Sequence, residues 1–582
     1  MGVQYMKKIL AAALTLAFLA AGCTQQGGQQ GSTTSTTTTN TTNTTTTSVG
    51  VPAGVLSGAP ANTSATEQNS WTVPHVLRMT VGEDIENLNP TLTQDIPVSG
   101  MLGPLTMAYL IKWDRHNNPY PELVTQVPTQ QNGGVSKDGL TITYHLRHGV
   151  KWSDGAPFTA DDVIWSFHAV LNPANNVVSR IGFDRIAKID EPDKYTVVVH
   201  LNKPYSPFIE VFFSTAGANP CVMPKHVLAQ LPNINNAEYN SKPVGIGPFM
   251  VKDWQRGSRV VLVANPNYFR GMPKLKEIDY EIITNNNTVL TEMQAKSLDM
   301  FYQAPQNMVG QFASLKTFNT WTQPSYLFRH IDFNLTSPKL KDYAVRQALR
   351  LATDRATILA KLYHGIGVLQ EEPAPKVAPF WDPNIKMQPF DLAAANALLD
   401  KAGWKRGADG VRAKNGVRLD LDFATASGTV INDQLIEQLR QTWEQIGIRL
   451  TVSHYLNTLL FAPYADGGIL YRGKFDIIYF AWAQDAIGDF SATYSCDSIP
   501  PNGQNDLHWC NPTAQTAMKA LYTHYDQAQR NKDDAIVMEQ LDKDVPTIVL
   551  MGTEGLWVTN KDLKNFDPGE LAPFDNFMNV DI

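Results

Sequence analysis

Apolar and polar positions alternate most clearly between residues 140 and 146, where the pattern predicts a half-buried strand. Turn residues stand on both sides, with Asp138-Gly139 before the strand and Ser153-Asp154-Gly155 after it. Residues 160–171 then carry apolar side chains at helical spacing. Thr159 and Asp162 match a capping box in which Asp replaces the usual Glu or Gln. The stretch therefore predicts a turn, a strand, a second turn and a helix, and none of its residues indicates a reaction.

Similar patterns predict further elements along the chain. Strands are expected at residues 77–81, 109–114, 195–201 and 475–480, and a hairpin at 249–264. Helices are expected at 341–352, 354–362, 391–402 and 431–446, with a strand at 448–452 after the last of them. The segment 475–480 is apolar throughout, so it predicts a buried strand. Residues that follow such a strand emerge at its C-terminal end, where open α/β sheets usually bind ligands.

The N-terminus predicts an exported protein. Lys7-Lys8 form a short basic region, and residues 9–21 form an apolar core of about 13 residues, too short for a bilayer span of roughly 20. Residues 1–22 are therefore interpreted as a signal peptide. The sequence Leu19-Ala20-Ala21-Gly22-Cys23 looks like a bacterial lipoprotein cleavage site, although Leu stands one place earlier than usual. Cys23 is the expected lipidation site; the alternative is a plain secretory signal with an incidental Cys.

Residues 23–71 are rich in Thr, Asn and Gln and contain few apolar or charged side chains. Such a composition cannot bury enough surface to offset the entropy of ordering the chain. We therefore expect a disordered tether between a lipid anchor and the folded part of the protein.

Composition excludes several classes of protein. The chain has 582 residues, of which 43% are hydrophobic, and a net charge of −7 with scattered Lys and Arg, which argues against nucleic acid as a partner. No G-x-S-x-G, H-E-x-x-H, Walker or C-x-x-C motif is present, so no enzyme, cofactor or metal site is predicted. The pairs Asp161-Asp162 and Glu371-Glu372 are expected to be solvated structural residues. About 510 residues remain after the tether, enough for two to four domains.

The segment from Ser136 to Phe167 resembles a signature of the family 5 extracellular solute-binding proteins, the peptide- and nickel-binding receptors of ABC importers. Further segments resemble this family in the expected order: 244–249 (VGIGPF), 265–269 (NPNYF), 332–334 and 341–349. The pair Gly245-Ile246-Gly247 is not interpreted as a phosphate loop, because Pro248 lacks an N–H and a strand follows. The resemblance implies an α/β, two-lobed periplasmic-binding-protein-like fold of class II, with an extra inserted domain.

The resemblance also implies where the domains lie. Lobe one is expected to combine residues 72–115, 235–325 and 545–582. The extra domain is expected at 116–234 and lobe two at 326–544. Hinges between the lobes are then expected near 323–327 and 545–548.

The candidate ligand-binding residues follow from the same resemblance. Peptide-binding members have a Trp-x-x-Asp whose Asp holds the ligand's α-ammonium, and Trp482 and Asp485 match it. The alternatives are a core Trp and an Asp that caps a turn. Tyr326 is a second candidate, with packing at the hinge as its alternative. Arg329 is the candidate for a ligand carboxylate, with a structural or solvated role as its alternative.

Four cysteines are present. Cys496 and Cys510 are close in a loop rich in Pro, Gly and Asn, and in an exported protein this spacing predicts a local disulfide. Some dipeptide-binding members of the family have a similar pair, and closing such a loop stabilises by about 3 kcal/mol. Two unpaired thiols are the alternative. Cys221 is expected to be a buried, small apolar residue.

We therefore expect a monomeric, lipid-anchored receptor that captures short peptides in a cleft between two lobes and delivers them to an ABC permease. It would lie in the periplasm or on the outer face of the cytoplasmic membrane. Two alternatives remain open: a receptor of the same fold for a nickel chelate, an oligosaccharide or an opine, and a sensor or chaperone-like surface lipoprotein without a role in import.

Overall fold

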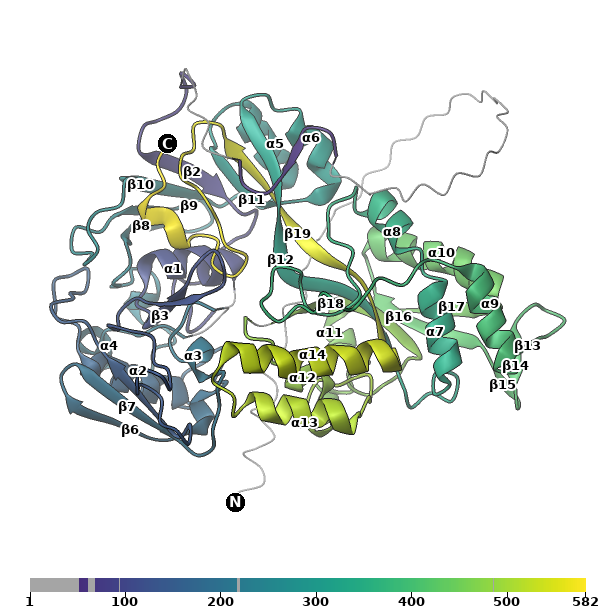
Figure 1. The fold of residues 1–582 in the computed structure, drawn as a ribbon. Coiled ribbons are helices and arrows are strands. Elements are labelled where there is room, and N and C mark those ends of the chain that lie inside the picture. The colour runs from purple at the N-terminus through teal and green to yellow at the C-terminus, as the bar shows by residue number, and fades with distance from the viewer. Residues whose placement is uncertain (1–51, 61–67, 94, 217–219, 485) are drawn as a thin grey trace.

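The computed structural model describes residues 52–60, 68–93, 95–216, 220–484 and 486–582 (Figure 1). The predicted signal peptide and Cys23 lie outside these ranges, and so does Asp485. Within the ranges, no helix combines the length and the apolar character that a bilayer crossing requires.

One sheet of 11 strands passes through both lobes. Ten of its strands follow one another in the order β17 (Arg449–Tyr455), β16 (Asp420–Ala426), β18 (Ile477–Ala483), β12 (Phe318–Phe333), β19 (Thr547–Asn560), β11 (Met300–Ala304), β2 (Val76–Thr80), β10 (Glu277–Glu281), β9 (Arg259–Ala264) and β8 (Phe249–Gln255). The two long central strands, β12 and β19, run antiparallel and connect the two halves (Figure 1).

The pairing of β12 with β19 is interrupted where the strands pass between the lobes. The register shifts between Pro324, which pairs with Glu554, and Phe328, which pairs with Gly552. This bulge lies within the expected first hinge at 323–327. The expected second hinge, 545–548, lies at the start of β19, whereas the bulge faces 552–554. The lobe boundaries themselves stay predictions.

Lobe one packs short helices against its part of the sheet: α1 (Gly103–Thr106), α5 (Asn286–Gln294) and α6 (Val309–Ala313), with one π-helical turn at Pro97–Leu102 and 3-10 turns at Glu238–Asn240, Gln306–Met308 and Asp575–Met578. Its core includes Leu77, Ile278 and Trp321, all fully buried. The predicted hairpin at 249–264 is confirmed as β8 and β9. Gly245 and Gly247 lie against α1, where added Cβ atoms would come within 1.8 Å of Thr106 O and 2.1 Å of Leu105 O. These glycines thus allow two backbone segments to touch.

The inserted domain holds a three-stranded sheet with a helix packed against it. Its elements are β5 (Thr141–His145), β6 (Ile186–Asp193), β7 (Thr196–Leu201), α2 (Ala160–Leu171), α3 (Phe208–Val211) and α4 (Lys225–Leu228), with a 3-10 turn at Phe183–Arg185; β3 (Ile111–Trp113) and β4 (Pro119–Pro121) pair at its border. The predicted strand and helix of this region are confirmed. So is the capping box, since Thr159 N donates to Asp162 Oδ2 at 3.1 Å. Cys221 is fully buried, as expected.

Lobe two surrounds its strands with helices. These are α7 (Tyr343–Leu351), α8 (Arg355–Leu362), α9 (Leu392–Lys401), α10 (Val430–Trp443), α11 (Asn457–Leu460), α12 (Ser491–Tyr494), α13 (Pro512–Leu521) and α14 (Gln527–Asp544), with 3-10 turns at Glu444–Ile446, Tyr464–Asp466 and Cys496–Ser498, and a small sheet of β13 (Lys405–Arg406), β14 (Arg412–Lys414) and β15 (Val417–Arg418). The predicted caps are confirmed: Asp354 accepts from Thr357 N, and Asp391 accepts from Ala394 N.

Two expectations are wrong in part. The tether predicted as disordered over 23–71 contains β1 (Val55–Ser57), which pairs in parallel with Thr320–Thr322 of β12. The edge of β12 offers backbone hydrogen-bonding groups to this short segment, and Val55 also packs against a buried apolar cluster of lobe one. The overall composition of 23–71 does not report either contact. The carboxylate pairs were expected to be solvated, but Asp162 is 4% and Glu372 3% exposed, and the Glu371 side chain is 3% exposed. Asp162 accepts from Lys225 N and Glu372 accepts from Asp382 N, partners that lie far from them or outside their local pattern.

Candidate ligand-binding site

The C-terminal ends of three parallel strands lie at one edge of lobe two. β16 pairs in parallel with both β17 and β18, so the loops after all three strands leave the sheet at this edge. Such an edge gathers loop residues from distant parts of the sequence, and ligands of open α/β sheets usually bind there. β18 continues to Ala483, three residues beyond the predicted end, so Trp482 belongs to the strand itself.

Trp482 forms part of an aromatic wall at this edge. Its ring is half-buried and stands edge-to-face against Phe480, with centroids 5.2 Å apart, and Phe480 stands in the same way against Phe461 at 5.8 Å. Tyr455 and Tyr464 pack against the same apolar cluster. Because Trp482 is only half-buried, part of it stays accessible for contact with an apolar ligand group.

The loop after β18 is held on both sides of Asp485, which lies outside the described residues. Gln484 N donates to Tyr326 O at 2.9 Å, and Ala486 N donates to Glu210 Oε1 at 2.8 Å. Ala486 is buried in a small cluster that includes Trp113 of β3. The residues that flank the predicted ligand anchor are therefore fixed by contacts with lobe two, the inserted domain and lobe one.

Tyr326 lies in the β12 bulge with its side chain turned into lobe two. Its residue is 5% exposed, and its ring stands 6.3 Å from Phe380 in an apolar cluster that also contains Trp509. This burial favours the packing alternative for the ring. Its carbonyl oxygen, through Gln484, still supports the loop after β18.

Arg329 and Trp482 project from opposite faces of the sheet. Directly paired residues of antiparallel strands share a face. Trp482 pairs with Phe328, whereas Arg329 pairs with Ala481. The structure thus separates two residues that the sequence grouped in one site.

Two tyrosines hold the Arg329 guanidinium. Its Nη1 donates to Tyr479 Oη at 3.1 Å, and its centre lies 5.1 Å from the Tyr363 ring centroid. The two tyrosine hydroxyls are 2.6 Å apart. Burial raises the pKa of Tyr363 well above its usual value, so this hydroxyl stays protonated and neutral at physiological pH.

Arg329 is therefore a half-buried cation without a carboxylate partner among the described residues. Two other arginines of lobe two have one, since Arg355 pairs with Glu371 at 2.8 Å and Arg350 pairs with Asp542 at 2.6 Å. Arg346 instead donates to the backbone carbonyls of Leu340 and Asp544. Because a buried charge is costly unless it is paired, an incoming carboxylate would be favoured at Arg329.

Sequence reasoning missed two residues that hold the loop after β18. Glu210 lies in α3 and is 5% exposed, and Arg530 lies in α14 and is 6% exposed. Arg530 Nη2 donates to Ile487 O at 2.6 Å. A lone acid within the apolar run 207–213 could have marked Glu210 as unusual, but nothing in the local pattern points to its partner 276 residues away.

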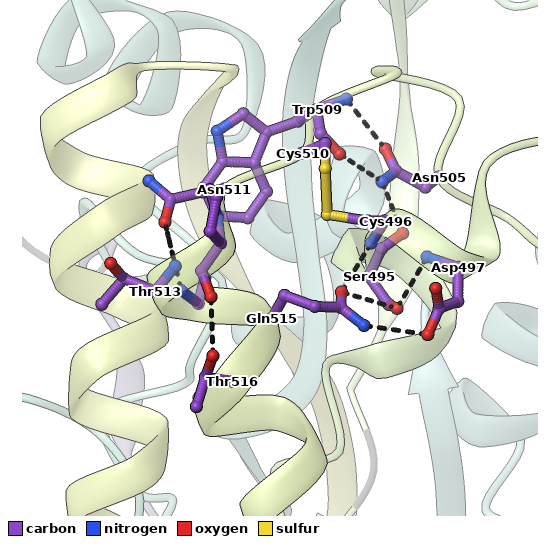
Figure 2. The surroundings of a disulfide bond; sticks show 12 residues. Ser495, Cys496, Asp497, Asn505, Trp509, Cys510, Asn511, Thr513, Gln515 and Thr516 are labelled. Atoms are coloured by element: carbon purple, nitrogen blue, oxygen red, sulfur yellow. Dashed lines mark hydrogen bonds between the residues drawn. A yellow bond between two sulfur atoms is a disulfide. The ribbon is translucent and has the colours of Figure 1, made fainter.

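Cys496 and Cys510 form a disulfide that closes the chain between α12 and α13 (Figure 2). Asn505 lies inside this loop, where its Nδ2 donates to Ser495 O at 2.9 Å and to Trp509 O at 2.7 Å. Gln515 of α13 accepts from Cys496 N at 2.7 Å. The disulfide and these amides tie the segment that follows the candidate site to the start of α13.

No group of three or more His, Cys, Asp or Glu side chains suited to hold a metal ion occurs in the part of the chain that the structure describes. The groups gathered around the strand ends are instead aromatic rings, backbone amides and, on the other face, one guanidinium. They can bind an organic ligand by apolar contact and by charge pairing.

Comparison with known proteins identifies the family of the chain. The family model described as bacterial extracellular solute-binding proteins, family 5 Middle, matches residues 118–503. The chain is 31% identical over 318 residues to Protein XP55 of Streptomyces lividans, a match that covers 55% of this chain and 57% of that protein. It is 24% identical over 414 residues to the oligopeptide-binding protein AppA of Bacillus subtilis, covering 70% of this chain and 74% of AppA.

The fold is also that of a solved structure. The structure of Bacillus subtilis AppA in complex with a nonapeptide superposes with a TM-score of 0.67 and 21% identity, covering 87% of this chain and 98% of that one. At this level of identity the likeness shows the two-lobed fold and leaves the ligand to be argued from the residues of the site.

Proposed function

Because this chain belongs to the family 5 bacterial extracellular solute-binding proteins, we propose that it captures short peptides between its two lobes and delivers them to an ABC permease. The observation that carries the proposal is the family match over residues 118–503, joined to the similarity with an oligopeptide-binding protein. The function is binding rather than catalysis, since ligand capture needs complementary contacts and closure but no reacting group.

The α-ammonium of the peptide is proposed to pair with Asp485. This residue follows β18 at the edge where the three strand ends meet, and its neighbours Gln484 and Ala486 are held by hydrogen bonds. A carboxylate in a site closed to water forms a strong charge-assisted pair with an ammonium and rejects a ligand that lacks one. Trp482 is proposed to contact the first apolar side chain of the peptide.

Arg329 is proposed to bind a carboxylate of the ligand. Support comes from the absence of a described acidic partner and from the two tyrosines, which fix the guanidinium without neutralising it. Because Arg329 and Trp482 lie on opposite faces of the sheet, one ligand reaches both only by passing around the strand ends. We expect an extended ligand such as a peptide to fit this arrangement better than a compact one.

Calorimetry with a pool of di- to pentapeptides tests the proposal. We expect binding of free peptides, a loss of about tenfold or more on N-acetylation, and a comparable loss on C-amidation. The Asp485→Asn variant should bind free and acetylated peptides equally, and Arg329→Gln should bind free and amidated peptides equally. Arg418→Gln, a change at an exposed arginine, is the matched control.

Four results would contradict parts of the proposal. Equal binding of free and acetylated peptides by the unaltered protein would exclude Asp485 as the ammonium anchor. Equal binding of free and amidated peptides would exclude Arg329. Binding of nickel–histidine or of an oligosaccharide, with no binding of any peptide, would replace peptides by another solute. Uptake of labelled peptide that is unchanged in cells lacking the protein would count against the role in import.

A further inference from the structure

The inserted domain contacts lobe two directly, in addition to lobe one from which it emerges. α3 of the inserted domain lies beside α14 and the end of α13 (Figure 1). Ser206 Oγ donates to Leu521 O at 2.7 Å, and Ser206 N donates to Tyr522 O at 2.9 Å. These two bonds join segments more than 300 residues apart in the sequence, since Ser206 and Leu521 are separated by 315 positions.

Aromatic rings extend this contact. The rings of Tyr205 and Tyr522 meet edge-to-face at 5.3 Å, and the Arg185 guanidinium lies 4.2 Å from the first and 5.3 Å from the second. Tyr525 Oη accepts from Tyr205 N at 3.2 Å and donates to Gly139 O at 2.9 Å. Gly139 has φ +69°, and a Cβ there would lie 2.7 Å from the Tyr525 ring, so both its turn and this contact require glycine.

Glu210 carries the contact to the loop after β18. Its carboxylate is buried and accepts from Ala486 N at 2.8 Å, while Arg530 Nη2 of α14 donates to Ile487 O on the same loop at 2.6 Å. The loop is therefore hydrogen-bonded to the inserted domain through Ala486 and to α14 through Ile487. A charged acceptor is a strong partner for a backbone N–H in a buried position, because neither group can turn to water instead.

We propose that the inserted domain takes part in ligand capture: Glu210 positions the loop after β18 for the ligand, and Ser206, Tyr205 and Tyr525 hold the inserted domain on lobe two. These four residues with their partners are called the latch. The inference rests on the proposed function, because the loop after β18 is the proposed ligand site. Glu210 is a positioning residue, since it acts through Ala486 N.

The physical effect of the latch is a bias on the equilibrium between open and closed arrangements. Contacts that exist only when lobe two and the inserted domain meet favour the closed arrangement before ligand arrives. The apparent ligand affinity is proportional to the fraction of molecules in the arrangement that can bind, so it falls when that fraction falls. Loss of the latch should therefore weaken binding without altering any group that touches the ligand.

Amide hydrogen exchange and calorimetry on the full chain test the role of Glu210. In Glu210→Ala, proteolytic fragments of the protein that contain Ala486 should exchange their amide hydrogens faster. The dissociation constant of the peptide ligand should rise about tenfold. Glu210→Gln keeps an acceptor oxygen and should retain most of both properties. Unchanged exchange at Ala486 in Glu210→Ala would overturn the positioning role, and so would a dissociation constant within twofold of the unaltered protein.

A second variant distinguishes loss of the latch from a general loss of folding. Tyr525→Phe removes only the hydroxyl that bridges Tyr205 and Gly139. Small-angle scattering of the ligand-free variant should give a larger radius of gyration than the unaltered protein, and saturating ligand should restore the smaller value. An unchanged radius would overturn the latch. The exchange measurement and the comparison of ligand-free radii need no ligand. They therefore decide on the latch even if the unaltered protein binds no peptide and the proposed function fails.

Discussion

Glu372 shows how one buried acid can make the stability of the whole protein depend on pH. Its residue is 3% exposed, and its Oε1 accepts from Asp382 N at 3.0 Å. Burial raises the pKa of Glu372 from 4.5 to about 9. A carboxyl with a raised folded-state pKa stabilises fully below its unfolded pKa, and this contribution is lost as pH rises through the folded value. The contribution of Glu372 therefore declines between pH 4.5 and about 9.

The Glu372→Gln variant should be more stable than the unaltered protein in alkaline solution. Glutamine keeps an acceptor for Asp382 N and has no charge to bury. Thermal unfolding at pH 8 should give a melting temperature higher by about 2 °C or more, with no difference at pH 4. Glu437→Gln, at a largely exposed position, is the control. Equal shifts at both pH values would contradict the assignment.

Among the elements, the disulfide-closed segment between α12 and α13 continues directly from the loop of the candidate site. The bond spans 14 positions, and Asn505 fills the interior of the loop. Asn511, next to Cys510, caps α13 by accepting from Thr513 N and Ala514 N. Fixing Cys510 therefore also fixes the start of α13, whose far end carries the Leu521 contact of the latch.

Loss of the disulfide should lower stability by about 3 kcal/mol in a loop of this length. Urea unfolding of the Cys496→Ser/Cys510→Ser double variant, compared with the unaltered protein, measures the difference. The unaltered protein should lose the same stability in a reducing buffer, whereas the double variant should be insensitive to reductant. Identical curves for the unaltered protein with and without reductant would show that the bond contributes nothing in solution.

The elements that the sequence predicted well have local causes. The strand at 141–145 and the helix at 160–171 follow from alternation, from helical spacing and from Thr159 with Asp162. β1 could not be predicted, because Val55–Ser57 form a strand only through the edge that β12 offers. Glu210 was missed for the same reason, since its partner Ala486 lies 276 positions away. Asp485 and Cys23 lie outside the described residues and stay predictions.

For the whole molecule, the proposed attachment to the membrane depends on Cys23, which the sequence predicts to be lipidated. We expect the Cys23→Ser variant to move from the membrane fraction to the soluble fraction, because the substitution removes the thiol that would carry the lipid. Cell fractionation followed by immunoblotting measures this. Cys221→Ala, a change at a fully buried cysteine, should leave the protein in the membrane fraction. Sedimentation of Cys23→Ser with the membranes would contradict lipid anchoring.

The paired strands β12 and β19 determine what kind of movement the lobes can make. Cα pairing runs from Phe318 with Asn560 to Asp332 with Thr547 and is interrupted only at the bulge and at one further shift beside Arg329. Among the described strands, Gln323 and Pro324 of β12 pair with β19 alone, so the sheet is two strands wide at this point. Two paired strands bend more easily across the face of the sheet than within its plane, because in-plane bending breaks hydrogen bonds. We therefore expect a swing about a single axis through the bulge. A movement about a single axis has one degree of freedom. One pair of spectroscopic labels, one in each lobe, would therefore follow the whole opening and closing movement through a single distance.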